Sequence, residues 1–402
     1  MTPTAGGPTG RDFASVLATL VALHACMAST RVAASLAVLQ QGYAAWVVGA
    51  LLSLYAVAPI LLSLWAGRMA DRHGFHRPVA WSVAMAQVGA ALPVLSQHIG
   101  ALAISGLLTG GALSTAAVTV QREAGRMARD ADDLKRVFSW VALGPALSNT
   151  AAPVLTGLLI DHVGFRAAFA FGAVLPLFGA WAAWQVPRGA PAAPVSAGRA
   201  LPGSGAFDLL RIPLLRNLLL VNVAMAAAWD SHSFTVPVVG HARELSASAI
   251  GLVLSSFALA SIAVRVAIVR WGDRIGEQRA LMGATSLATV ALLAYAWLPG
   301  TLGMMAGSAV LGIALGSVQP MVLSMLHQAA PPERQGQALA LRMLFTNAAT
   351  ISMPLMFGLL AAATTNAAPM WLMAALMVAA RWPAKKLGPA GSERLEADSA
   401  RV

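Results

Sequence analysis

Cysteine is almost absent from this 402-residue chain, which contains one, Cys26. A single cysteine excludes an internal disulfide and any metal site built from several cysteines. Charged residues are also scarce, at 11% of the chain, whereas 58% of the residues are hydrophobic and the mean hydropathy is +0.70. So few charges cannot cover the surface of a soluble globule, and the composition therefore predicts an integral membrane protein.

Two further absences narrow the class. The apolar runs are continuous over about 20 residues rather than short and alternating, which predicts membrane-spanning helices and not a β-barrel. The chain has no Gly-rich phosphate-binding loop with Lys and Ser or Thr, so ATP is excluded as the energy source. It also lacks a dense cluster of His and carboxylate residues, and we predict neither a metal site nor a cofactor.

Acidic residues are the scarcer charge, because 16 Asp and Glu stand against 27 Lys and Arg and give a net charge of +11. The bases occupy alternate connections between the apolar runs, and the positive-inside rule places such connections in the cytoplasm. By this assignment 22 of the 27 Lys and Arg residues lie on the predicted cytoplasmic side. The other five are Arg31, Arg166, Arg243, Arg265 and Arg342. The pattern predicts two cytoplasmic termini and an even number of spans, and it does not indicate a nucleic-acid partner.

The connection between the second and third apolar runs carries a dense set of charges and glycines. It reads GRMADRHGFHR and contains Gly67, Asp71, Arg72, Gly74 and Arg77. Glycine permits a tight turn and close helix approach, while one acid among several bases can pair selectively. With an apolar run on either side, these residues are expected in a short loop at a membrane surface.

The same pattern recurs in the second half of the chain, where Asp273, Arg274 and Gly276 repeat Asp71, Arg72 and Gly74 at an offset of 202 residues. A second pair of segments has nearly the same spacing, since APVLTGLL at 152–159 is echoed by MPLMFGLL at 353–360, offset by 201. Two unrelated motifs with almost one offset indicate duplicated halves.

The Gly-x-x-x-Asp-Arg-x-Gly-x-x-Arg loop at 67–77, whose Asp-Arg-x-Gly-x-x-Arg part is repeated at 273–279, resembles the signature loop of the major facilitator superfamily of secondary transporters. The resemblance implies an all-α membrane protein with twelve transmembrane helices in two pseudo-symmetric six-helix bundles, which work by alternating access without covalent chemistry. We predict an N-terminal bundle at 1–186, a cytoplasmic linker at 187–213, a C-terminal bundle at 214–384 and a cytoplasmic tail at 385–402. The expected protein is not an enzyme but a monomeric, multi-pass protein of the inner (plasma) membrane.

The resemblance also implies a conformational latch. The loop acid, Asp71, is expected to pair with Arg122 at the end of the fourth helix and with the positive N-terminus of the eleventh helix near Gln337. The predicted latch residues are Gly67, Asp71, Arg72, Gly74, Arg77, Arg122, Asp273, Arg274 and Gly276.

The fifth predicted helix, at about 137–160, contains proline and glycine in a pattern similar to the Gly-Pro motif of antiporters in this superfamily. It departs from that motif, because Ala152 and Thr156 stand where glycines are expected. A transmembrane proline loosens the backbone and glycine permits close contact, so a bend against a neighbouring helix is expected. The predicted hinge residues are Gly144, Pro145, Pro153, Gly157, Pro354 and Gly358.

Ionisable residues inside apolar runs are costly and mark candidate functional sites. Asp230 is the one carboxylate placed well inside a predicted span, and an offset of 201 puts its neighbour His232 at the position equivalent to Arg31. We predict a substrate and proton-coupling site at Arg31, Asp230, His232, Arg342 and Asn347. Alternatively, the arginines extend to the membrane interface and Asp230 caps a kinked helix.

Taken as a secondary transporter, the chain is predicted to couple protons to the efflux of small amphipathic or anionic organic molecules. Two alternatives remain open: proton-coupled uptake of an organic anion, and a non-transporting receptor or scaffold with the same fold. A receptor would need a large soluble output segment.

The charge pattern generates a test of orientation. In a variant without Cys26, single cysteines placed at position 196 or 392 should be inaccessible to a membrane-impermeant maleimide added to intact cells, and a cysteine at position 243 should react. Labelling of the first two from outside would overturn the predicted topology.

Overall fold

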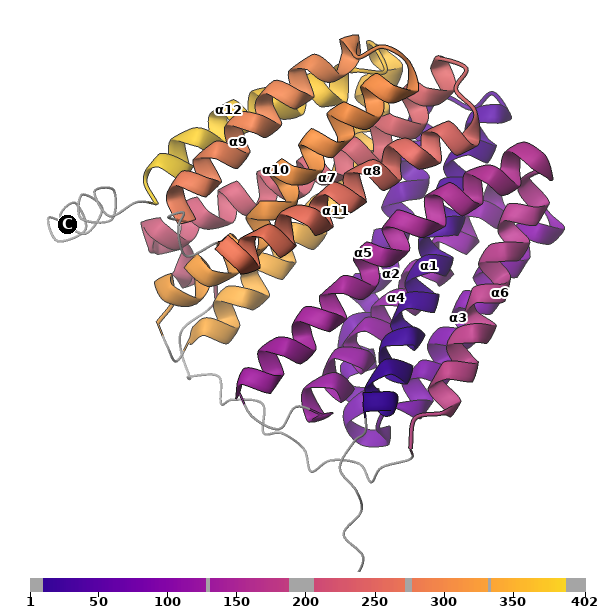
Figure 1. The fold of residues 1–402 in the computed structure, drawn as a ribbon, viewed down its shortest axis with the longest axis horizontal. Helices are drawn as coiled ribbons and strands as arrows, with labels where there is room; N and C mark the ends of the chain where they lie inside the picture. The colour runs from indigo at the N-terminus through magenta and orange to yellow at the C-terminus, as the bar shows by residue number, and fades with distance from the viewer. Residues whose placement is uncertain (1–9, 128–130, 188–205, 272–276, 332–333, 388–402) are drawn as a thin grey trace, which may run out of the picture. The chain divides into compact units, whose positions relative to one another are not determined.

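The computed structural model describes residues 10–127, 131–187, 206–271, 277–331 and 334–387 (Figure 1). Within these ranges the chain is helical and has no strand. This confirms the predicted all-α membrane fold with twelve long helices.

The first six helices alternate in direction and are joined by short connections. They are α1 (Gly10–Gln40), α2 (Ala45–His73), α3 (His76–Leu95), α4 (Ile99–Met127), α5 (Ala131–His162) and α6 (Phe165–Trp184).

The 3₁₀ helix η1 (Ala206–Arg211) opens the second half, and another, η3 (Tyr295–Trp297), follows α9. The remaining helices are α7 (Pro213–Ala242), α8 (Ala247–Trp271), α9 (Glu277–Ala294), α10 (Gly300–Ala329), α11 (Gln335–Ala363) and α12 (Ala368–Lys385).

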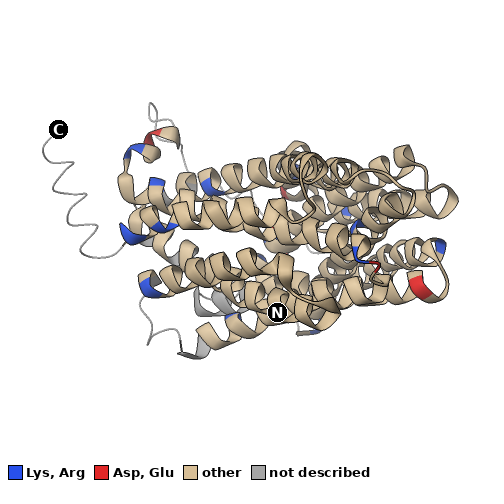
Figure 2. Ribbon diagram, turned by 90° about the horizontal axis from the view of Figure 1, so that it is seen from above, with Lys and Arg blue, Asp and Glu red and all other residues tan. Residues whose placement is uncertain are grey.

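Length and composition allow ten of these helices to cross a membrane within the described residues. A helix satisfies its own backbone hydrogen bonds, which a hydrocarbon environment requires. The two exceptions are α7 and α12: α7 contains Asn217, Asn222, Asp230 and His232, and α12 ends in basic residues. Figure 2 shows that charged residues lie mostly near helix ends.

The chain forms two compact units. Unit 1 comprises Met1–Tyr43, Leu51–Ala197 and Ser246–Ser255, and unit 2 comprises Ala44–Ala50, Gly198–Leu245 and Ser256–Val402. The first residues of α2 therefore group with unit 2 and those of α8 with unit 1, whereas the sequence-based division assigned each helix to one bundle.

Both units have the same internal packing. In unit 1, α1 packs against α4, α5 and α6, and α3 packs against α4 and α6. In unit 2, α7 packs against α10, α11 and α12, and α9 packs against α10 and α12. Adding six to each helix number of unit 1 reproduces the pairs of unit 2, as expected for a duplicated chain.

A close backbone crossing accompanies this duplication. A Cβ atom on Gly110 of α4 would collide with the carbonyl oxygen of Tyr55 on α2, and one on Gly312 of α10 would collide with that of Phe257 on α8. The offset between the two crossings is 202 residues, as in the charged motif. Small residues let membrane helices approach to backbone contact, so these glycines set the helix spacing in each unit.

The charged motif is more helical than expected. Rather than forming a loop over residues 67–77, the chain continues α2 to His73 and begins α3 at His76. Gly74 makes the turn with φ of 71°, a left-handed conformation that glycine adopts without steric cost, and its N–H donates to the Ala70 carbonyl at 2.9 Å. The fourth helix was expected to end near Arg122, but α4 continues to Met127.

Phe75 fixes this turn to the core of unit 1. Its side chain is 4% exposed and belongs to an apolar cluster with Val16 of α1, Val79 of α3, Val120 of α4 and Val186 after α6. Burial of this phenylalanine holds the charged turn against the ends of four helices.

The backbone crossings generate a stability prediction. Gly110→Ala and Gly312→Ala should each lower the free energy of unfolding by about 1–3 kcal/mol, because the new methyl group forces the backbones apart. Thermal unfolding of the detergent-purified protein measures the loss. Gly283→Ala in α9 is the control, since no atom lies within 4 Å of its added Cβ. Equal stability of all three variants would show that the crossings are not tight.

Candidate functional site

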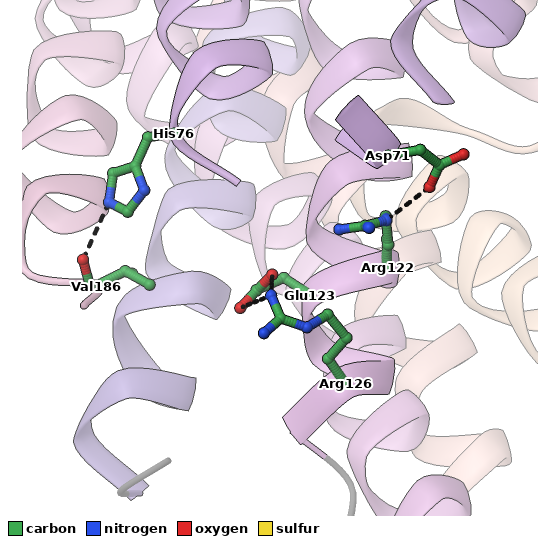
Figure 3. Close-up of polar contacts among 6 residues, drawn as sticks. All are labelled: Asp71, His76, Arg122, Glu123, Arg126 and Val186. Atoms are coloured by element: carbon green, nitrogen blue, oxygen red, sulfur yellow. Dashed lines mark hydrogen bonds and ion pairs between the residues drawn. The ribbon is translucent and has the colours of Figure 1, made fainter. Parts of the chain in front are cut away.

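The structure brings Asp71 and Arg122 together at one end of unit 1. The Arg122 Nε donates to Asp71 Oδ1 at 2.8 Å and thereby links the last turns of α2 and α4 (Figure 3). The Asp71 side chain is 60% exposed and that of Arg122 is 19% exposed. Such an exposed ion pair contributes about 0–1 kcal/mol to stability, which suits a contact that forms and breaks more than one that holds the fold.

Neighbouring polar contacts fasten the same end of the unit. Arg126 pairs with Glu123 one turn apart on α4, at 3.0 Å, and His76 Nε2 lies 3.0 Å from the Val186 carbonyl oxygen (Figure 3). The other predicted latch residues of the first copy do not join the pair: Arg72 and Arg77 are exposed, and Gly67 faces Val118 of α4.

Asp273, Arg274 and Gly276 lie outside the described residues, between the end of α8 at Trp271 and the start of α9 at Glu277.

The predicted hinge residues occupy uninterrupted helices. Pro145 and Pro153 lie inside α5, and Pro354 lies inside α11. Gly144 faces α1, where an added Cβ would lie 3.2 Å from a methyl group of Val21.

Gly157 and Gly358 lie at backbone crossings. In unit 1 a Cβ on Gly157 would collide with Ala247 at the start of α8, and in unit 2 one on Gly358 would lie 2.7 Å from the Trp46 Cα at the start of α2. The proline one turn earlier faces a glycine in each case, Pro153 with Gly251 and Pro354 with Gly49.

Asp161, which was not among the predicted site residues, adds a polar contact to the first of these crossings. Its two carboxylate oxygens accept the N–H groups of Ala247 and Ser248 at 2.9 and 2.8 Å, so it caps the N-terminus of α8. The residue equivalent to Asp161 in the second half is Ala362. The sequence feature that could have identified this cap is an acid, Asp161, near the end of a predicted helix and four residues after the repeated Gly157.

The predicted coupling residues divide between the two units. Arg31 lies in α1 of unit 1 and is half-buried, close enough to His24 and Tyr55 for its charge to act on both. Asp230 and His232 lie in α7 of unit 2 and are 6% and 1% exposed.

The structural repeat corrects the equivalence drawn between Arg31 and His232. Gly42 and Glu244, with φ of 80° and 57°, follow the first helix of each half and lie 202 residues apart. This offset pairs Arg31 with Ser233, one residue further along α7. One residue of an α-helix corresponds to a rotation of about 100°, so the equivalent positions differ in the direction they face.

His232 belongs to a buried polar and aromatic cluster. Its Nε2 lies 2.8 Å from the Ser308 hydroxyl of α10, which lies 2.7 Å from the Tyr295 hydroxyl of η3. Its ring stacks on Phe257 at a centroid distance of 4.3 Å. Residues i and i+2 do not face each other on a helix, so Asp230 lies on a different side of α7.

The remaining candidates lie on α8 and α11. Arg265 Nε donates to the Gly316 carbonyl at 3.4 Å, and Arg342 is half-buried. Asn347 is exposed, and its neighbour Thr346 accepts the hydrogen bond from Asn222 of α7 at 2.9 Å. The described residues contain no group of three His, Cys, Asp or Glu side chains placed to hold a metal.

The sequence profile of the Major Facilitator Superfamily matches residues 17–301 and 218–390, which together span most of the chain. The chain belongs to the Major Facilitator Superfamily. It is accordingly a multi-pass membrane transporter and not an enzyme.

Solved structures of superfamily members have the same fold. A peptide transporter POT in complex with sulfate is 16% identical with a TM-score of 0.74, and the match covers 96% of this chain and 95% of that one. The nucleoside transporter NupG is 15% identical with a TM-score of 0.71, and the match covers 94% of this chain and 99% of that one. The human organic anion transporter MFSD10 (TETRAN) is 17% identical with a TM-score of 0.64, and the match covers 94% of this chain and 100% of that one.

The ion pair generates a prediction for this superfamily member. Asp71→Asn should insert and fold normally but reduce transport roughly fivefold, since loss of about 1 kcal/mol in one conformational state changes its population by that factor. Initial rates in proteoliposomes measure the effect. Arg122→Gln should match it, whereas Arg126→Gln, which removes only a contact within α4, should transport normally. Wild-type rates in Asp71→Asn would remove the pair from the transport cycle.

Proposed function

We propose that this transporter couples protons to the export of small amphipathic or anionic organic molecules by alternating access. The observation that carries the proposal is Asp230, an acid that is 6% exposed inside α7 of a transporter. A carboxylate at that depth marks an ion or proton pathway more often than a structural site.

Proton coupling follows from the chemistry of Asp230. A buried carboxyl group exists in a charged and a neutral form that interact differently with their surroundings, and two conformations with different environments bind the proton with different affinity. In the proposed cycle the proton stabilises one conformation and the substrate the other. Asp230 carries the proton, and Arg31 interacts with the substrate.

The proposed substrate class rests on the sign of the charges inside the helices. Arg31, Arg265 and Arg342 are arginines within membrane-spanning helices, and guanidinium groups favour carboxylate and phosphate groups of a ligand. The human structural neighbour named as an organic anion transporter is consistent with this class. We further propose that the Asp71–Arg122 pair acts as the conformational latch of the cycle.

Export is proposed over uptake because the proline and glycine pattern of α5 is similar to that of antiporters. In proteoliposomes with an imposed pH gradient, an exporter exchanges substrate for protons, and an importer moves both in the same direction. The direction of substrate movement relative to the gradient distinguishes the two. A protein that moves no member of a panel of organic anions and cationic drugs would instead fit a non-transporting receptor.

Asp230→Asn is the sharpest test of coupling. Asparagine resembles the protonated carboxyl group, so the variant should lose gradient-driven accumulation by about tenfold or more and still exchange substrate down its own gradient. Both activities are measured in the same proteoliposomes. Asp208→Asn, which alters an exposed acid in η1, should behave as wild type. Uphill transport with wild-type pH dependence in Asp230→Asn would assign coupling to another residue.

A further inference from the structure

Arg31 is a charged group without a partner among the described residues. It lies in the membrane-spanning helix α1, and its guanidinium makes no hydrogen bond or ion pair with any described side chain or carbonyl. The described acids on the helices around it are remote or engaged. Asp12 lies in the first turn of α1, Asp71 pairs with Arg122, Glu123 pairs with Arg126, and Asp161 at the end of α5 caps α8. The charge inside unit 1 is therefore not neutralised by a neighbouring carboxylate.

His24 is a second group that lacks a partner beside this charge. It lies two turns before Arg31 on the same side of α1, is 8% exposed, and its Nδ1 is buried without a hydrogen bond. Long side chains on a helix lean toward its N-terminus, so the Arg31 side chain extends toward His24. The charge of Arg31 acts on the imidazole.

Tyr55 brings a third group to the same region from α2. It is 6% exposed, its ring lies over Gly106 of α4, and its hydroxyl is buried without a hydrogen bond. The Thr30 and Ser105 hydroxyls lie nearby; Thr30 donates to backbone carbonyls of α1, and Ser105 Oγ is buried without a hydrogen bond as well. The charge of Arg31 acts on this phenol as well.

These three groups share one chemical requirement. A guanidinium, an imidazole N–H and a phenolic O–H are all hydrogen-bond donors, and leaving buried donors unpaired is costly. A carboxylate offers two oxygens with about four lone-pair positions and one negative charge, so it can satisfy several donors and neutralise Arg31. A cation is disfavoured by the arginine, and a neutral hydroxyl compound would leave the charge uncompensated.

We propose that Arg31, His24 and Tyr55 form an oxyanion subsite in unit 1 that binds a carboxylate group of the transported molecule. The proposal rests on the proposed transport of organic anions and adds to it the side chains that would recognise the charged group. Arg31 supplies the charge, Tyr55 and His24 supply directed hydrogen bonds, and Gly106 leaves space for the tyrosine ring.

The experiment measures binding to the purified full-length protein in detergent, without a proton gradient. Sodium formate and sodium benzoate are the probes, and each replaces sodium chloride at constant ionic strength while thermal unfolding is followed. Formate is the smallest carboxylate and tests the subsite alone, and benzoate adds an apolar body. Both should raise the melting temperature of the wild type above its value in chloride, and titration gives an apparent Kd.

Three variants assign the binding to these residues. Tyr55→Phe keeps the ring on Gly106 and removes only the O–H, so the Kd for both carboxylates should rise about tenfold. Arg31→Gln should abolish the difference between carboxylate and chloride. Arg166→Gln, which removes an exposed arginine at the start of α6, should bind as wild type.

Other outcomes would overturn either the subsite or the proposed function. Equal melting temperatures in formate, benzoate and chloride would mean that water alone satisfies these donors, and an unchanged Kd in Tyr55→Phe would place the bound carboxylate elsewhere. If Arg31→Gln does not fold, Tyr55→Phe decides the question. Binding with the expected variant pattern but without transport in proteoliposomes would refute the proposed function and leave the subsite standing. Transport of organic anions without carboxylate binding in the melting experiment would refute the subsite and leave the proposed function standing.

Discussion

Close approach of helix backbones at glycine is the constraint on which the rest of the structure depends. Inside a bilayer, apolar side chains gain little by leaving lipid for protein, and helix association relies on close packing and on polar contacts between helices. Gly110 and Gly312 supply such packing in units 1 and 2, where each lies against the backbone of a bulky aromatic residue. The tyrosine hydroxyl and the histidine cluster are positioned by these crossings, because Tyr55 and Phe257 are the residues whose carbonyl groups make the contact.

Charge has a different role at the ends of the helices and inside them. At the helix ends, Asp71, Glu123 and Asp161 each have a basic or backbone partner, and solvent limits the strength of these contacts. Inside the helices, Arg31 and Asp230 lie where an ionised side chain is costly and marks a candidate functional site. In the proposed cycle, conformational contacts and substrate chemistry are therefore carried by separate sets of residues.

The sequence predicted the helices, the repeat and the Asp71–Arg122 contact because each depends on a strong pattern: long apolar runs, a duplicated motif and a family resemblance at the motif. It misplaced the end of α2, because apolar periodicity cannot show that a charged segment stays helical until a left-handed glycine. It missed Tyr55, Ser308 and Asp161, because the contacts of an isolated polar residue depend on which residues of other helices lie beside it, and the sequence pattern does not show this. The equivalence of Arg31 with His232 failed by one residue, since an offset measured at α5 and α11 does not hold for α1 and α7.

The two offsets locate a difference in length between the duplicated halves. Equivalent positions of the two halves are 202 residues apart at the ends of α1 and α7, and still 202 apart at the ends of α4 and α10, Met127 and Ala329. At Pro153 and Pro354 the offset is 201 residues. One residue was thus gained or lost between Ala329 and Pro354 or in the equivalent part of the first half. Inside a helix, that event would turn every later side chain by about 100° and move Pro354 and Gly358 away from α2. Both contacts are retained, so the length change lies before Pro153 and Pro354, and the parts of α5 and α11 that carry the backbone crossings kept their rotation.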